Sequence, residues 1–515
     1  MKTVAELLRW RARQHPARPA LLHAGRETSY AALDRGASRV ANALVAAGVR
    51  PGDRVCVADK GHDAFFELLF GIAKAGAVFT PVNWRLAPPE LAYVIRDAGA
   101  PVLVVGHEFA EAVASVEGQL GKVRTILRFG SGPERWPAYE SWRDAAADTD
   151  PRRDGAEDDT AWQLYTSGTT GHPKGAEITH RNLFTTMEAG LQGFGGLAAG
   201  GVGLICMPLY HIGGAGYALC LFHAGMTLVV QRQFEPGDTL RLLSQERVNH
   251  AFLVPAMLNF LLQHPDCARS DFSQLRTILY GASPIPEELL RQAIARFGCD
   301  FVQAYGLTET TGAVVLLSSE EHRAGGDRLR SCGKPTFGTE LRVVDGEGRE
   351  CATREVGEIV VRGPAVMKGY WNLPDATRSA IRDGWFHTGD AGYFDEQGFL
   401  YIHDRVKDMI VSGGENIYPA EVESVLFAHP AVADAAVIGV PDSRWGEAVK
   451  GVVVLHPGAS ASAEEILAFC RGKIAGYKIP KSIDFAEALP RNPTGKILRR
   501  ELRERYWAGR ERRVN

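Results

Sequence analysis

Short apolar runs alternate with helical segments through most of this chain. Each run is rich in β-branched residues, and several end in a glycine or small-residue turn before a helix. The clearest runs are residues 54–57, 101–105, 125–127, 251–255 and 277–280. This alternation predicts an α/β architecture with largely parallel sheets. Ligands of such sheets collect at the carboxyl ends of the strands, so we expect the functional residues there.

The pattern changes after residue 330, where segments such as 358–363 and 398–402 are typical of short hairpin strands. Residues 404–408 then interrupt the apolar pattern with four charged side chains. A second α/β pattern follows, with strands expected at 435–440 and 451–455. We therefore predict a large N-terminal domain, residues 1–404, and a small C-terminal domain, residues 405–515.

The most apolar region, residues 212–230, contains a histidine and several glycines, which favours a buried helix and strand over a membrane span. A length of 515 residues and a net charge of −3 fit a multidomain protein and argue against a nucleic-acid surface. The eight cysteines form no C-x-x-C pair, and the start of the chain does not resemble a signal peptide. We expect a reduced, cytoplasmic protein. Peripheral contact with a membrane and a homodimer stay open.

One segment, YTSGTTGHPKG at residues 165–175, carries the most chemistry. It contains three glycines, four serine or threonine hydroxyls and Lys174. Glycines let backbone N–H groups converge on one point, hydroxyls add donors, and lysine adds a mobile positive charge. This combination predicts a loop that wraps a polyphosphate, although a surface turn has similar composition. The spacing differs from the phosphate loop of kinases and GTPases, which requires Gly-x-x-x-x-Gly-Lys-Ser/Thr.

The full segment resembles the signature of the adenylate-forming superfamily, which includes acyl-CoA synthetases, luciferases and peptide-synthetase adenylation domains. Further segments match the same family in the same order: 209–211, 280–284, 303–309, 385–390, 412–419 and 491–496. The resemblance implies a large N-terminal domain of stacked α/β sheets with a β-rich subdomain, and a small mobile C-terminal α/β cap.

The matched segments imply roles in ATP binding. Tyr305 would stack on adenine, Thr308 would donate to the α-phosphate, and Asp390 with Arg405 would hold the ribose. Glu309 would hold Mg²⁺, a cation that prefers one or two carboxylates with phosphate oxygens and water. The complete expected nucleotide set is Thr166, Ser167, Gly168, Thr169, Thr170, Gly171, Lys174, Gly281, Ala282, Gln303, Ala304, Tyr305, Gly306, Thr308, Asp390, Arg405 and Lys496.

The same resemblance implies an acyl pocket and a moving cap. Lys407 would be the hinge, where many relatives carry Asp, and the cap would swing about it. The expected catalytic residues are Lys496, Glu309, Thr166, Lys174 and His211. The expected pocket residues are Tyr210, His211, Val254, Gly281, Ala304, Thr311 and Gly312. Ser412, Gly413 and Gly414 would let the pantetheine arm of CoA pass close to the backbone.

These roles imply an ATP-dependent carboxylate–CoA ligase that forms acyl-AMP and then acyl-CoA, with Mg²⁺ as cofactor and ATP and CoA as co-substrates. Segments 368–372, 412–419 and 490–496 look most like bacterial fatty-acyl-CoA synthetases, which favours a medium- or long-chain fatty acid. An aryl-acid CoA ligase for cinnamate- or benzoate-type acids is the alternative. An amino-acid adenylation domain, a luciferase-like oxidation and a non-catalytic acyl- or nucleotide-binding protein are weaker hypotheses.

Overall fold

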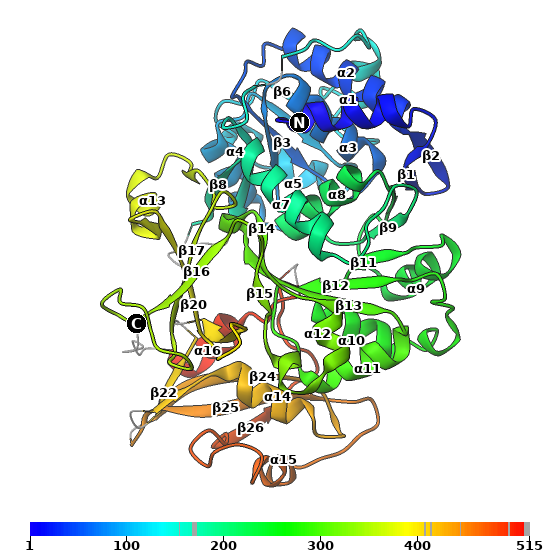
Figure 1. Ribbon diagram of the computed structural model, residues 1–515. Coiled ribbons are helices and arrows are strands. Elements are labelled where there is room, and N and C mark those ends of the chain that lie inside the picture. Colours follow the sequence, from blue (N-terminus) through cyan, green and yellow to red (C-terminus); the bar gives the residue numbers. More distant parts are fainter. Residues whose placement is uncertain are drawn as a thin grey trace.

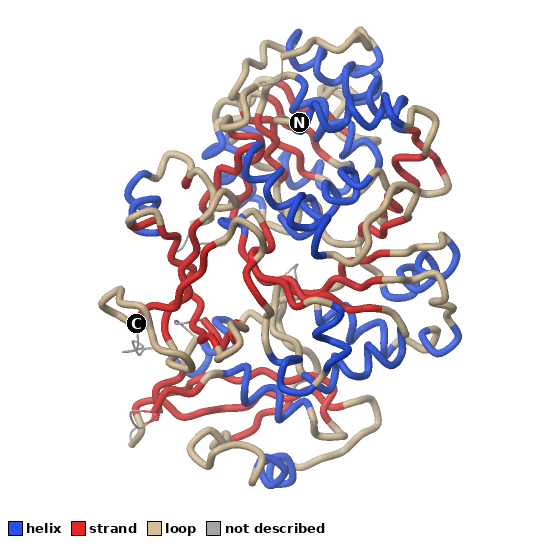
Figure 2. Tube along the Cα trace, viewed as in Figure 1, coloured by secondary structure: helices blue, strands red, loops and turns tan. Residues whose placement is uncertain are grey.

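The structure is a computed structural model that describes residues 1–153, 155–166, 172–405, 408–412, 415–442, 444–492 and 495–508. Within these ranges the strands form four sheets, and helices cover them (Figures 1 and 2). The predicted α/β class is therefore confirmed. The helices are α1 Val4–Gln14, α2 Tyr30–Ala46, α3 Asp63–Lys74, α4 Pro88–Ala98, α5 Ala110–Ala114, α6 Tyr139–Asp144, α7 His180–Gly193, α8 Ile212–Ala224, α9 Pro236–Gln245, α10 Pro255–Gln263, α11 Glu287–Phe297, α12 Ser319–Ala324, α13 Pro374–Ala380, α14 Pro419–Phe427, α15 Ala463–Cys470 and α16 Arg499–Trp507.

Two large sheets form the body of the N-terminal part. The seven-stranded sheet runs β18 (Gly369–Tyr370), β8 (Lys174–Thr179), β7 (Thr160–Thr166), β4 (Val78–Pro81), β3 (Arg54–Ala58), β5 (Val102–Val105), β6 (Thr125–Arg128). The nine-stranded sheet runs β15 (Lys334–Pro335), β14 (Gly312–Leu317), β13 (Asp300–Leu307), β12 (Thr277–Gly281), β11 (His250–Phe252), β9 (Val202–Ile205), β10 (Thr227–Val230), β1 (Pro19–His23), β2 (Arg26–Ser29). The middle strands of both are parallel, and β3, β5 and β12 are buried along their whole length because helices cover both faces of the sheets.

One continuous core joins these two sheets through α2, α3 and α8. The ring of Phe222 on α8 lies edge-on to Tyr30 of α2 and to Phe66 and Phe70 of α3, with centroids 6.0, 5.4 and 5.1 Å apart. The apolar region 212–230 is thus a buried helix followed by a strand, as its composition predicts. No helix in the described part of the chain combines the length and apolar character needed to cross a membrane.

The remaining two sheets belong to the C-terminal half. The third contains β16 (Glu340–Val344), β17 (Gly357–Arg362), β20 (Trp385–Phe394), β19 (Ile381–Arg382) and β21 (Leu400–Arg405). The fourth contains β23 (Glu415–Ile417), β22 (Ile410–Ser412), β25 (Gly446–Leu455), β24 (Val432–Asp442) and β26 (Ser482–Phe485). In Figure 1 this last sheet, in orange, lies at the end of the molecule opposite the N-terminus. The chain passes from the third sheet to the fourth between Arg405 and Ile410, directly after the position of the predicted domain boundary.

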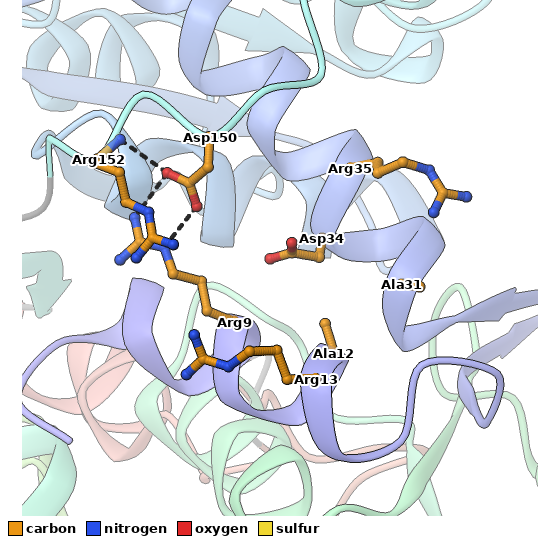
Figure 3. Close-up of a pocket in the computed structure, with 8 residues that line it drawn as sticks. All are labelled: Arg9, Ala12, Arg13, Ala31, Asp34, Arg35, Asp150 and Arg152. Carbon is orange, nitrogen blue, oxygen red and sulfur yellow. Dashed lines mark hydrogen bonds and ion pairs between the residues drawn. The ribbon is translucent and has the colours of Figure 1, made fainter.

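A surface cavity of about 250 Å³ lies between α1, α2 and the segment around Asp150 (Figure 3). Asp150 accepts hydrogen bonds at 2.6 and 2.9 Å from Arg9, and the buried ammonium of Lys74 lies 3.1 Å away. Burial alone would raise the pKa of Asp150, but Arg9, the Arg152 backbone N–H and Lys74 hold it well below its ordinary value. The carboxylate therefore links α1 and α3 to the segment around Asp150.

We expect Asp150→Asn to lower the unfolding free energy by about 2 kcal/mol, because Arg9 and Lys74 lose a charged acceptor in a mostly buried place. Chemical denaturation at neutral pH measures this loss. Asp148→Asn is the matched control, since the Asp148 carboxylate is half exposed and 3.8 Å from its arginine. Equal denaturation midpoints for Asp150→Asn and Asp148→Asn would contradict the stabilising role of the Asp150 carboxylate.

Candidate active site

The two flanks of the glycine-rich loop are neighbours in the seven-stranded sheet. Thr166 ends β7, Lys174 begins β8, and the two residues are cross-strand partners. β8 leads directly into α7, whose first turn is capped reciprocally by Thr179 and Asn182. The expected loop residues Ser167, Gly168, Thr169, Thr170 and Gly171 lie outside the described residues.

Glu309 lies in a 3-10 turn, Thr308–Thr310, directly after β13. Its Oε1 accepts a hydrogen bond from the Tyr370 hydroxyl at 2.8 Å, and its backbone oxygen accepts one from the Met367 N–H at 2.8 Å. No cluster of three acidic, histidine or cysteine ligands occurs among the described residues. A single carboxylate is nevertheless enough for Mg²⁺ when substrate phosphates supply the other oxygens. Glu309, with one carboxylate oxygen outside that hydrogen bond, fits the expected role.

Tyr305 and Asp390 are joined although they come from different sheets. The Tyr305 hydroxyl donates to Asp390 Oδ2 at 2.9 Å. Burial, reinforced by Asp390, raises the pKa of Tyr305 well above its ordinary value, so the phenol remains a donor. Arg405 is the cross-strand partner of Asp390 in the third sheet, which places the two expected ribose residues side by side.

Close backbone contacts explain two glycines in the matched segments. A Cβ at Gly281 would lie 2.1 Å from the Ala304 oxygen, and one at Gly306 would lie 1.8 Å from the Gly312 oxygen. Only glycine therefore lets β12, β13 and β14 approach as they do. Ala282 and Thr311 adopt left-handed φ angles of 65° and 56° at the turns that follow.

Gln303 occupies a different environment from the other expected nucleotide residues. Its amide is hydrogen-bonded to Tyr280 at 3.4 Å and to Cys332 at 3.5 Å. These partners are buried. The Gln303 side chain thus links strand β12 to the segment that precedes β15.

His211 caps α8 and contacts Tyr210, with ring centroids 4.4 Å apart. Burial, together with the positive charges of Arg85 and Lys496, lowers the pKa of His211 to about 3. The imidazole is therefore neutral near pH 7. Its Nε2 is buried and has no hydrogen-bond partner among the described residues.

The expected pocket residues Gly312, Thr311 and Val254 lie in different surroundings. A Cβ at Gly312 would be 3.6 Å from Ile212 and 3.7 Å from Thr186, an ordinary contact distance. The Thr311 hydroxyl donates to the Ala365 oxygen at 2.7 Å, so it is occupied within the protein. Val254 precedes α10 and is fully buried.

The loop that carries Lys496 docks on the N-terminal part. A Cβ at Gly495 would lie 3.0 Å from Ala256 and 3.2 Å from Val254. A second contact joins the two parts, because Asn259 donates to the Ala433 oxygen at 3.2 Å. Lys496 consequently acts electrostatically on His211, beside the expected acyl pocket.

The expected hinge and CoA loop are mostly not described. Lys407, Gly413 and Gly414 lie outside the described residues. Ser412 ends β22 and pairs with Gly446 at the start of β25. The backbone of Arg405 is described, whereas its side chain is not.

Sequence reasoning did not assign roles to two residues near the site, Arg85 and Tyr370. Arg85 follows β4 and contributes positive charge to the surroundings of His211 and Tyr210. Nothing in the local sequence distinguishes it from a solvated arginine. Tyr370 belongs to segment 368–372, in which the sequence indicates only a resemblance to fatty-acyl-CoA synthetases.

Comparison with known protein families matches residues 8–371 to the AMP-binding enzyme model and residues 421–496 to the AMP-binding enzyme C-terminal domain. The chain belongs to the AMP-binding enzyme family. The predicted membership of the adenylate-forming superfamily is therefore confirmed. The predicted enzyme class, an acid–thiol ligase, is confirmed as well.

Relatives of this AMP-binding enzyme match along its whole length. A fatty acid–acyl-carrier-protein ligase, ScoC, of Streptomyces coeruleorubidus is 42% identical over 100% of this chain and 98% of its own. A feruloyl-CoA synthase of an Amycolatopsis species is 44% identical over 96% and 97%. The crystal structure of the anthranilate CoA ligase AuaEII with anthranoyl-AMP superposes with a TM-score of 0.92 at 28% identity, covering 98% of this chain and 97% of that one.

Proposed function

We propose that this protein is an ATP-dependent carboxylate–CoA ligase that works through an acyl-AMP intermediate. The observation that carries the proposal is the docking of the Lys496 loop on Val254 and Ala256, next to His211. A lysine of the proposed cap would then lie beside the proposed acyl pocket. Support for the nucleotide site comes from Tyr305, which is hydrogen-bonded to Asp390 of β20, and from Glu309, which follows the same strand as Tyr305, β13. The names of relatives that make CoA thioesters support the choice of thiol.

In the first half-reaction, a carboxylate oxygen of the acid attacks the α-phosphorus of ATP. The bond from the α-phosphorus to the bridging oxygen breaks, and pyrophosphate leaves. Since His211 is neutral, the positive charge beside the carboxylate comes from Lys496 and Arg85. Lys496 counters the charge that develops on the α-phosphate in this attack. Mg²⁺, when bound by Glu309 and phosphate oxygens, would neutralise charge on the departing pyrophosphate.

In the second half-reaction, the CoA sulfur attacks the acyl carbonyl and AMP leaves, while the thiol proton passes to solvent. The proposed hinge at Lys407 lets the cap rotate, which removes Lys496 and presents Gly413 and Gly414 to the pantetheine arm. The protein forms no covalent bond to substrate in either step. Its contribution is positioning and charge neutralisation.

We propose a medium- or long-chain fatty acid as the acid. ScoC and the mycobacterial ligase FadD13, 38% identical over 99% of this chain, are named for fatty acids, which supports this choice. Gly312 leaves room for about one methyl group, because a Cβ there would lie at ordinary van der Waals distance from Ile212 and Thr186.

An aryl acid is the second candidate, because aromatic rings gather around α8 and His211. Trp84 lies edge-on to Tyr210 with centroids 6.1 Å apart, and Tyr217 lies edge-on to Phe252 with centroids 5.8 Å apart. Such rings favour edge-to-face contact with a planar acid. The name of the feruloyl-CoA synthase supports the same class.

A panel of fatty acids, benzoates and cinnamates, scored by acid-dependent release of pyrophosphate and then by AMP formation with and without CoA, tests the proposal. We expect one class of acid to give pyrophosphate, and CoA to raise the rate of AMP release. If none of the acids in the panel causes release of pyrophosphate, a non-catalytic binding protein is favoured. Product transfer to a carrier-protein thiol in preference to CoA would correct the choice of thiol.

A further inference from the structure

The segment from Met367 to Trp371 connects the two halves of the proposed nucleotide site. The Met367 N–H donates to the backbone oxygen of Glu309 at 2.8 Å. The Lys368 and Trp371 N–H groups donate to backbone oxygens of β8 at 2.9 and 2.8 Å. This short segment, which contains β18, therefore holds the Glu309 turn at a fixed distance from the strand that follows the glycine-rich loop.

Trp371 anchors the end of this segment. Its indole N–H donates to the backbone oxygen of Asp97 at 3.1 Å, and the guanidinium carbon of Arg54 lies 3.3 Å from the centroid of the Trp371 ring. Arg54 is buried and donates to Gln163 of β7 at 2.8 Å and to Glu177 of β8 at 2.9 Å. Arg54 thus ties Trp371 to both strands that flank the glycine-rich loop.

Tyr370 lies between the two groups that the proposed function assigns to phosphate and metal. Its hydroxyl donates to Glu309 Oε1 at 2.8 Å, and the Lys174 ammonium lies 5.1 Å from its ring centroid. This second distance is typical of a cation–π contact. In the described part of the chain, Lys174 and Glu309 form no ion pair with each other.

We propose that Tyr370 is a positioning residue that keeps Lys174 and Glu309 apart and ready for a magnesium-bound polyphosphate. A direct pair would neutralise the ammonium meant for phosphate and occupy the carboxylate meant for metal. Tyr370 prevents this, because its hydroxyl satisfies one oxygen of Glu309 and its ring satisfies Lys174. The other carboxylate oxygen remains for the cation. This inference rests on the proposed adenylating function and assigns a role that the motif comparison does not.

Two substitutions separate the two contacts of Tyr370. Tyr370→Phe keeps the ring for Lys174 and removes the hydrogen bond to Glu309. Tyr370→Leu removes both. Calorimetric titration of the full-length protein with ATP, without acid, in excess Mg²⁺ or in a chelator, measures the affinities without any reaction.

We expect Tyr370→Phe to weaken binding of magnesium-ATP about tenfold, the effect of one hydrogen bond to a charged group, and to leave metal-free ATP unchanged. Tyr370→Leu should weaken binding in both conditions, because Lys174 is then free to pair with Glu309. Tyr401→Phe is the matched control. Its ring stacks on Tyr393 at 5.0 Å, in the third sheet.

Two results would overturn the inference. One is a Tyr370→Phe protein that binds magnesium-ATP as tightly as wild type. The other is an equal loss with and without Mg²⁺, which would indicate only a structural role. The proposed function itself would be contradicted if the wild-type protein bound no magnesium-ATP and released no pyrophosphate with any acid. If the wild type is active and Tyr370→Phe is unaffected, only the role of Tyr370 is contradicted.

Discussion

Lys496→Ala is expected to reduce acid-dependent pyrophosphate release by about 10²- to 10³-fold, the usual effect of removing one preorganised charge or donor from a transition state. Lys496 lies on a loop docked against Val254 and Ala256, and its charge reaches His211. The same variant should still convert supplied acyl-AMP and CoA to thioester at close to the wild-type rate, because the proposed cap rotation removes Lys496 before that step. Measuring the two half-reactions separately checks both statements.

Lys481→Ala is the matched control for this experiment, since it removes an exposed lysine from the same C-terminal part. Gly414→Leu provides the converse variant: it should spare pyrophosphate release and block thioester formation, because a side chain would obstruct the pantetheine arm. If Lys496→Ala and Gly414→Leu each lose both half-reactions equally while remaining folded, the proposed two-state cap is wrong.

Much of the fold follows from local sequence. The runs at 54–57 and 277–280 become β3 and β12, because short, mainly apolar runs between turn signals suit strands covered on both faces. Thr179 caps α7 because its hydroxyl accepts the hydrogen bond of a free N–H group in the first turn. The order of the nine-stranded sheet, with β10 lying between β9 and β1, does not follow, because it depends on contacts between segments about two hundred residues apart along the chain.

The site is predictable where a motif carries the chemistry and not where distant backbone segments meet. The motifs contain glycine at positions 281 and 306, but only the structure shows why. A Cβ at Gly281 or Gly306 would lie 2.1 or 1.8 Å from an opposing backbone oxygen. The link between Tyr370 and Glu309 joins residues far apart in sequence, so spacing could not reveal it. The core contacts of Gln303 are invisible for the same reason.

Asp390→Ala is expected to lower kcat/KM for ATP about 100-fold, because two hydrogen bonds from ribose hydroxyls to a carboxylate contribute about 3 kcal/mol together. Asp390 is buried, and it lies opposite Arg405 in the sheet. Steady-state pyrophosphate release at varied ATP measures the change, and KM should account for most of it. Asp327→Ala removes an exposed carboxylate and is the matched control.

A modified nucleotide distinguishes loss of the ribose contact from a general loss of structure at Asp390. If Asp390 binds the ribose, 2′,3′-dideoxy-ATP should be a poor substrate for wild type but should react with wild type and Asp390→Ala at similar kcat/KM. Tyr305→Phe removes the 2.9 Å hydrogen bond to Asp390 while keeping the carboxylate, so it should retain most of the discrimination between ATP and its dideoxy analogue. A Tyr305→Phe protein that loses this discrimination as completely as Asp390→Ala would instead show that the phenol, through its hold on Asp390, sets the geometry on which ribose recognition depends.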